Sequence, residues 1–124
     1  MARVVRVLGP VAALVLASVV LSSCGTNGAV TDARASCVLV NDALALQLQS
    51  QSPNLSAARR AKIEGHAMSE LLRATPAAAD ATSIDGSWNA LMTTINESER
   101  VPLQSLVPAL TRLCTVADSS TPYL

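Results

Sequence analysis

The period of the apolar residues constrains the fold of this chain more than any other feature. After residue 30, no segment shows the strict alternation of apolar and polar residues that is typical of a half-buried strand. Four segments instead repeat apolar residues at the i, i+3, i+4, i+7 spacing of an amphipathic helix. They cover about 31–50, 54–74, 82–96 and 102–117. The pattern therefore predicts an all-α protein.

Each expected helix carries one stripe that we expect to face the core. The stripes are Cys37, Val40, Leu44 and Leu48; Ala57, Ala61, Gly65, Met68 and Leu72; Ile84, Trp88, Leu91, Met92 and Ile95; and Leu103, Val107, Leu110 and Cys114. Thr75 and Pro76 are expected to end the second helix. Thr82 and Asp85 resemble a capping box that starts the third, although the alanine run at 77–81 is compatible with an extra helical turn. Pro108 should lie in the first turn of the fourth helix or kink it.

The N-terminal segment has the charge and hydrophobic order of an export signal. Arg3 and Arg6 precede the uncharged segment 7–21, whose 15 residues fall short of a membrane span. Directly after this segment, Leu21-Ser22-Ser23-Cys24 resembles the bacterial lipobox. The resemblance implies that the signal peptide, 1–23, is cleaved and that Cys24 is acylated. The chain as a whole is similar to small actinobacterial, mycobacterial-type lipoproteins of uncharacterised function.

A lipoprotein of this kind would be anchored in the lipid bilayer, on the extracytoplasmic face of the cell membrane. Two or three acyl chains on Cys24 are enough for stable anchoring. The segment 24–30 is rich in small residues and has no period, so we expect a short tether there. The helical domain is expected at 31–118, with a flexible tail at 119–124.

Without Cys24, two cysteines remain in a compartment that permits oxidation, and we expect Cys37 and Cys114 to form a disulfide. Its closure would stabilise the domain by on the order of 4 kcal/mol in the loop-entropy model. In an up-down-up-down bundle, the start of the first helix meets the end of the fourth. The cysteine pair therefore favours a small four-helix bundle stapled by one disulfide.

Composition and motifs argue against several classes of function. Nine basic residues balance nine acidic ones and only two residues are aromatic, so the chain lacks the features of a nucleic-acid binder. His66 is the only histidine; it falls opposite the second stripe, beside Glu70, and no nucleophile motif accompanies it. We therefore expect no enzyme activity, no catalytic residue, no metal site and no cofactor.

A small-ligand carrier is the alternative function. Small exported helical domains with a cysteine near each end resemble mycobacterial haem-binding proteins in outline, and the possible axial ligands here are His66, Met68, Met92 and Tyr123. These residues do not share a helical face. A lipid carrier would need a cavity of roughly 300 Å³ or more, which a small bundle rich in alanine and glycine cannot easily enclose.

One feature exceeds what a simple bundle requires. Leu39 and Leu46 form a second stripe on the first helix, roughly opposite the first stripe. Either this stripe is exposed for a partner or a second copy, or the first helix is central and is covered on both sides by the tail and neighbouring loops. The first option favours a membrane-anchored accessory or interaction module for the extracytoplasmic part of an envelope protein.

Overall fold

A computed structural model describes residues 26–122, in which every secondary-structure element is a helix. The elements are α1 (Thr26–Ser50), α2 (Ala57–Arg73), α3 (Thr75–Ile84), the short 3₁₀ helix η1 (Gly86–Trp88), α4 (Asn89–Glu97) and α5 (Leu103–Asp118). The all-α prediction is confirmed. The expected signal peptide, Cys24 and Tyr123 lie outside the described residues. No helix within 26–122 is long and apolar enough to cross a membrane.

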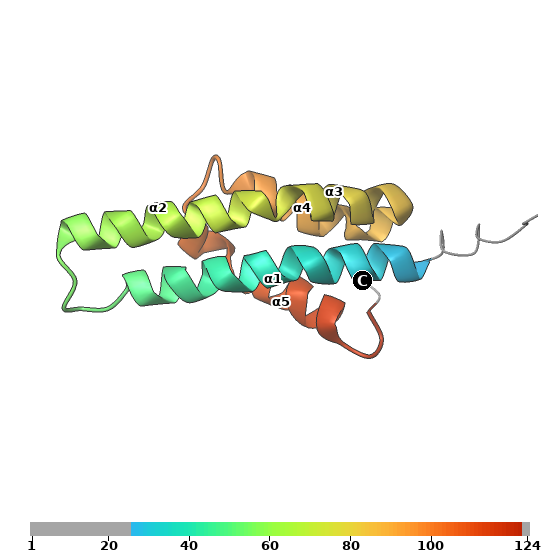
Figure 1. The fold of residues 1–124 in the computed structure, drawn as a ribbon, viewed down its shortest axis with the longest axis horizontal. Coiled ribbons are helices and arrows are strands. Elements are labelled where there is room, and N and C mark those ends of the chain that lie inside the picture. The colour runs from blue at the N-terminus through green and yellow to red at the C-terminus, as the bar shows by residue number, and fades with distance from the viewer. Residues whose placement is uncertain (1–25, 123–124) are drawn as a thin grey trace, which may run out of the picture.

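The helices form four antiparallel rods, because α2 and α3 run almost in line (Figure 1). The long α1 packs against α2 and α3 and, through other residues, against α5. α4 returns beside α3, and α5 reverses direction once more (Figure 1). The last turns of α1 and the first turns of α2 project beyond α4 and α5 as a two-helix hairpin (Figure 1). The up-down-up-down prediction is thus confirmed, with its second rod bent.

The turn between the second and third rods lies nearer the C-terminus than the break expected at Thr75 and Pro76. α2 does end at Arg73, but Ala74 keeps helical angles and Pro76 occupies the first turn of α3, where its missing N–H costs no hydrogen bond. The chain turns instead at Asp85, which is extended and whose carboxylate accepts a hydrogen bond from the Ser87 N–H at 2.9 Å. The expected start at Thr82 is wrong, because the Thr82 hydroxyl donates to the Ala78 carbonyl inside α3.

Eight of the 19 buried apolar residues of the core are alanines. Trp88 is 1% exposed and is the largest fully buried residue. The buried alanines let the helices approach closely, so that a small number of leucine, valine and isoleucine side chains fills the interior. The buried alanines are Ala29, Ala33, Ala43, Ala67, Ala74, Ala78, Ala81 and Ala117.

The first helix begins earlier than expected and includes most of the expected tether, 24–30. Residues 26–30 are helical, and Ala29 and Val30 are buried. The reason is that Ala29 and Ala33 continue the buried stripe of Cys37 and Val40 at intervals of three or four residues. The folded domain therefore reaches to within two residues of Cys24.

Three of the expected stripes are partly wrong. Ala57, Ala61 and Gly65 of α2 are exposed, whereas Ala67 and Leu71 are buried. The buried stripe of α2 is the one that continues through Ala74, Ala78 and Ala81 into α3, so the expected break at Thr75 obscured it.

At the ends of other helices, Leu48 is 72% and Ile84 is 44% exposed. Leu48 lies on the projecting hairpin, and Ile84 ends α3 next to the turn. In α5 the expected stripe is largely confirmed, since Leu103, Leu110 and Cys114 are buried. Pro108 lies inside α5, beyond its first turn.

Candidate functional site

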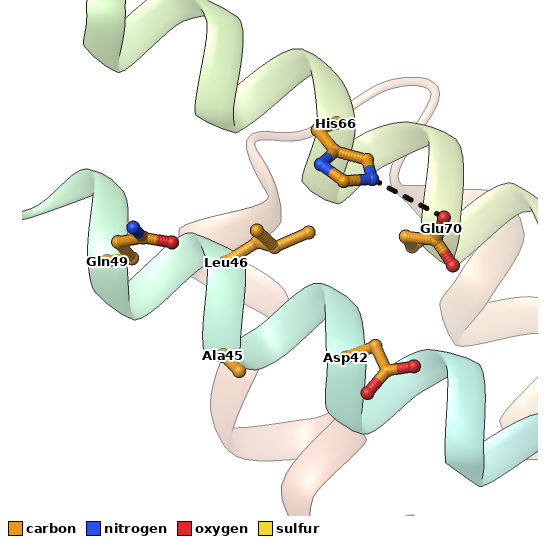
Figure 2. A pocket seen from close by; sticks show the side chains of 6 residues that line it. All are labelled: Asp42, Ala45, Leu46, Gln49, His66 and Glu70. Atoms are coloured by element: carbon orange, nitrogen blue, oxygen red, sulfur yellow. Dashed lines mark ion pairs between the residues drawn. The ribbon is translucent and has the colours of Figure 1, made fainter.

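An open groove lies between α1 and α2. Its volume is about 450 Å³, and it opens to solvent. Two rows of side chains face each other across it (Figure 2). They are Asp42, Ala45, Leu46 and Gln49 of α1, and His66 and Glu70 of α2.

Leu46 is the apolar centre of this groove. Figure 2 shows its side chain reaching from α1 toward α2. Leu39 precedes it by seven residues and therefore lies on the same face of α1. Both leucines are half-buried and pack against the core. Leu46 thus lies at the seam between α1 and α2, where a helix rather than the tail or a loop is its neighbour.

The charges along the α2 side are only partly neutralised. Glu70 accepts hydrogen bonds from one Arg73 guanidinium nitrogen, at 2.9 Å to each carboxylate oxygen. His66 Nε2 lies 3.5 Å from a Glu70 oxygen (Figure 2), and its side chain is 62% exposed whereas that of Glu70 is 16% exposed. Arg73 therefore pairs with the one carboxylate on this rim, and His66 lies beside the same carboxylate.

Two cations lie toward the N-terminal end of α2 and are not among the residues that line the groove. Arg59 and Lys62 precede His66 by seven and four residues, so the three side chains share one edge of α2. Arg59 and Lys62 are exposed, and neither has an ion-pair partner among residues 26–122. Arg60 differs, because it donates to the Ser52 carbonyl at 3.4 Å and so contacts the loop before α2.

The α1 side of the groove carries a single charged residue. Asp42 is its one charged residue and is exposed, without an ion pair among the described residues. Ala45 and Gln49 complete this rim and are uncharged. The groove therefore has Leu46 at its apolar centre, the carboxylate of Asp42 on the α1 side, and His66 with the Arg73-paired Glu70 on the α2 side.

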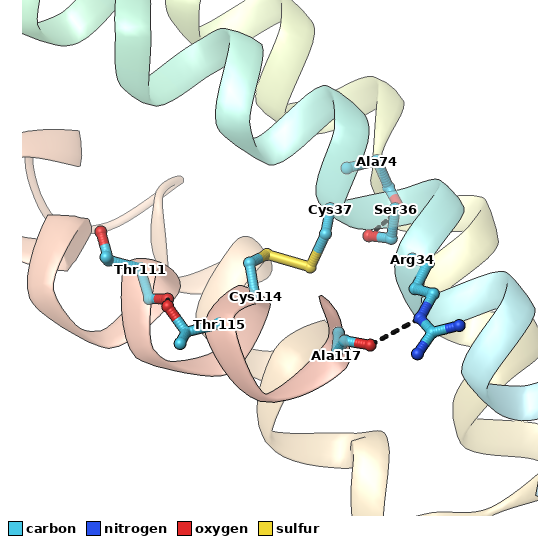
Figure 3. The surroundings of a disulfide bond; sticks show 8 residues. All are labelled: Arg34, Ser36, Cys37, Ala74, Thr111, Cys114, Thr115 and Ala117. Atoms are coloured by element: carbon cyan, nitrogen blue, oxygen red, sulfur yellow. Dashed lines mark hydrogen bonds between the residues drawn. A yellow bond between two sulfur atoms is a disulfide. The ribbon is translucent and has the colours of Figure 1, made fainter. Parts of the chain in front are cut away.

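The expected bond between Cys37 and Cys114 is present and joins α1 to α5 (Figure 3). The sulfur atoms are 2.03 Å apart and the Cα atoms 5.4 Å apart. One turn before Cys37, Arg34 donates from Nε to the Ala117 carbonyl at 2.7 Å and from a terminal nitrogen to the Ser119 carbonyl at 3.0 Å. The expected flexible tail is thus fastened to α1 at its first residue.

The candidate haem ligands within the described residues lie apart. His66 lines the α1–α2 groove, Met68 lines a different hollow beside Gln47 and Leu103, and Met92 packs against the core. Among residues 26–122, no three histidine, cysteine, aspartate or glutamate side chains are grouped as a metal site would require.

Sequence reasoning found Leu39 and Leu46 but missed the α2 half of the groove. The available indication was the spacing of His66 and Glu70 along one helical edge, which the analysis of His66 treated only as a solvated face. Comparison with known proteins found no matching family model, no similar curated protein and no matching solved structure. The groove is therefore interpreted from its residues.

Proposed function

We propose that this chain is an exported lipoprotein that serves as an accessory or interaction module for an envelope protein. In this proposal the signal peptide is cleaved before Cys24, and acyl chains on Cys24 hold the protein on the extracytoplasmic face of the cell membrane. The lipobox-like motif that ends at Cys24 supports the anchor. The Cys37–Cys114 disulfide is compatible with an oxidising compartment.

The docking surface in this proposal is the α1–α2 groove. The observation that carries it is the half-buried Leu46 at the floor of an open groove with polar rims. Binding surfaces between proteins commonly combine an apolar centre with a polar rim in this way. A helix laid along the seam would cover Leu46 and, one heptad away, Leu39.

The geometry of α1 suits presentation away from the bilayer. α1 begins at Thr26, two residues after the proposed anchor, whereas the groove residues of α1 lie between Asp42 and Gln49. At 1.5 Å per residue, the groove is about 25–35 Å from the start of the helix. A partner could therefore reach the groove without entering the headgroup region when α1 stands upright on the membrane.

The anchor is tested with Cys24→Ala in the full-length chain. We expect loss of acylation by mass spectrometry, loss of globomycin-sensitive processing, and a shift out of the detergent phase. Unchanged detergent partitioning together with globomycin-insensitive processing of the unaltered chain would contradict the lipoprotein proposal.

The groove is tested with Leu46→Gln against Leu48→Gln as a matched control on the same helix. Leu48 is 72% exposed and lies outside the groove, so its substitution should leave partner retention unchanged. Cross-linking in intact membranes should show loss of the partner only with Leu46→Gln. Native mass spectrometry of the purified protein separates the alternative function, because a haem or lipid that travels with the protein would favour a small-ligand carrier.

A further inference from the structure

Gln47 differs from the other buried polar residues of the described chain. Among residues 26–122, the buried polar residues are Gln47 and three serines, and each serine hydroxyl donates to a backbone carbonyl at 2.6–3.0 Å: Ser36, Ser50 and Ser98. Gln47 is only 6% exposed, yet its side-chain amide has no hydrogen-bond partner among these residues. A primary amide offers two donors and an acceptor oxygen, and buried polar groups are usually paired. The unpaired amide therefore calls for a partner from outside the described chain.

The Gln47 amide borders an open hollow of about 250 Å³. Among the described residues, no fully enclosed side-chain nitrogen or oxygen lacks a partner, so the unpaired amide reaches the hollow instead of ending in the sealed core. The lining comes from α1, from α2 and from the start of α5; it consists of Gln47, Glu64, Met68, Pro102, Leu103 and Gln104. The hollow is smaller than the roughly 300–1,000 Å³ of pockets for drug-sized ligands, so it suits a smaller molecule.

The start of α5 lies at this hollow without a cap. Pro102 precedes the helix and makes no side-chain hydrogen bond to it, and no acidic residue occupies the first turn. The backbone N–H groups of Leu103 and Gln104 have no acceptor among residues 26–122, whereas the Ser105 N–H donates to the Pro102 carbonyl at 2.9 Å. Unpaired N–H groups at the start of a helix carry partial positive charge and favour anions. This part of the hollow, together with the amide N–H groups of Gln47, therefore suits a carboxylate.

Glu64 adds a negative charge to the same hollow. It is exposed and has no ion-pair partner among the described residues, and no basic residue lines the hollow. Glu64 would repel a simple anion, and the positive end of α5 would disfavour a simple cation. A molecule that carries both a carboxylate and an ammonium group satisfies both sides of the hollow.

We propose that this hollow binds the zwitterion of a small aliphatic amino acid. The carboxylate of the ligand accepts hydrogen bonds from the Gln47 amide and from the first N–H groups of α5, and its ammonium group donates to Glu64. Its aliphatic side chain covers the apolar part of the lining, which includes Met68 and Leu103. The inference goes beyond the proposed docking function and does not depend on it, because the hollow and the α1–α2 groove share no lining residue.

Two simpler occupants would satisfy only part of the hollow. A peptide segment of a partner protein would pair its backbone with the Gln47 amide but leave Glu64 without a countercharge. An alkylammonium group, such as a lysine side chain, would bind Glu64 but leave the N–H groups of α5 without an acceptor. The zwitterion is therefore the occupant that uses the donors and the carboxylate together.

Methyl NMR of the methionines observes this hollow selectively. Met68 lines it, Met92 packs against the core, and the only other methionine of the sequence is Met1. The full-length protein, labelled with ¹³C at the methionine methyl groups and held in a non-ionic detergent, is titrated with L-alanine, L-valine and L-leucine; Met92→Leu assigns the signals. At least one of the three amino acids should shift the Met68 signal in a saturable manner and leave the Met92 signal in place. No Met68 shift with any of them at millimolar concentration would overturn the proposal.

Analogues that lack one charge test the zwitterion. For L-leucine these are isopentylamine, which lacks the carboxylate, and 4-methylpentanoate, which lacks the ammonium group; N-acetyl-L-leucine methylamide lacks both. Each should bind about tenfold more weakly than L-leucine or worse, because each loses a charge-assisted hydrogen bond. Equal affinity of the amine would assign the hollow to an alkylammonium group, and equal affinity of the blocked residue would assign it to a peptide segment. Either result would overturn the proposal.

Two substitutions locate the binding groups. Gln47→Leu removes the amide and should weaken L-leucine binding about tenfold or more, and Glu64→Gln should make L-leucine bind no better than 4-methylpentanoate. Gln51→Leu and Glu99→Gln make the same changes at exposed positions outside the hollow and should leave the affinity unchanged. Equal losses in the test and control variants would overturn the proposal.

Folding and the docking function are controlled separately. Circular dichroism checks each variant, and Glu64→Gln decides the question alone if Gln47→Leu does not fold, since Glu64 is exposed. Leu46→Gln should leave the affinity for L-leucine unchanged, because Leu46 lines only the α1–α2 groove. Loss of L-leucine binding in a folded Leu46→Gln variant would show that the ligand lies in the groove and would overturn the assignment to the hollow.

Discussion

The disulfide between Cys37 and Cys114 should provide a large share of the stability of this bundle. The two cysteines are 77 positions apart, so the bond closes a loop that contains most of the folded domain. The loop-entropy model gives about 4.5 kcal/mol at 25 °C for a loop of this length. Domains typically unfold with only about 5–15 kcal/mol, and loss of the bridge should therefore lower the melting temperature by roughly 20 °C or more.

Single and double substitutions separate the bridge from packing at its two sites. Cys37 and Cys114 are 0% and 2% exposed, so replacing either with alanine also removes one buried sulfur, at a cost of about 1 kcal/mol. Cys37→Ala and Cys114→Ala should each lose the bridge and one packing contribution. The double variant should lose only about 1 kcal/mol more, because the bridge can be removed only once.

Urea denaturation with and without a reducing agent measures these differences. Reductant should destabilise the unaltered protein toward the level of the single variants and leave the double variant unchanged. The reasoning is refuted if the two single losses add in the double variant, or if the reduced protein is as stable as the oxidised one after its free thiols have been titrated.

Three further substitutions test individual contacts, each by denaturant unfolding. Arg34→Ala removes two hydrogen bonds to the end of α5 and should cost about 1–2 kcal/mol, with faster carboxypeptidase digestion of the C-terminus. Ser36→Ala removes a buried hydroxyl that donates to the Ala74 carbonyl at 3.0 Å; the cost should be about 1 kcal/mol, since that carbonyl also accepts from another backbone N–H. Pro108→Ala supplies the missing donor for the Gln104 carbonyl inside α5 and should stabilise the protein by about 1–3 kcal/mol; a loss of stability would show that the proline fits its position.

The sequence predicted α5 well because its apolar pattern is strong and local, and it predicted the disulfide because only two cysteines remain once Cys24 is set aside. Large apolar residues recur through α5 at helical spacing, and Cys114 belongs to the same stripe. The α2–α3 rod was harder, because its buried stripe consists mainly of alanine, which is found both in cores and on surfaces. The adjacent Thr75 and Pro76 look like a helix end, and only the packing of α3 against α1 shows that the rod continues.

The groove could be predicted only in part for a related reason. Leu39 and Leu46 were identifiable as an additional stripe, but a single helix does not indicate which neighbour covers it. The pairing of α1 with α2 depends on the whole bundle, and it brings His66 opposite Leu46 although the two residues are 20 positions apart in the sequence. Leu48 is exposed because the α1–α2 hairpin extends beyond α5. The relative lengths of the helices cannot be predicted from the apolar pattern of α1 alone.

The positions of the disulfide and the groove on α1 suit a docking module. Cys37 and Leu46 are nine residues apart, a rotation of roughly 180° around the helix, so the covalent bond and the groove floor lie on opposite faces. The bond ties α1 to α5, whereas the contact of α1 with the α2–α3 rod consists, in the described residues, of packing and the hydrogen bond from Ser36 to the Ala74 carbonyl. In the proposed docking function, a partner would therefore contact a seam without a covalent link, while the disulfide holds α1 to α5 on the opposite face of α1.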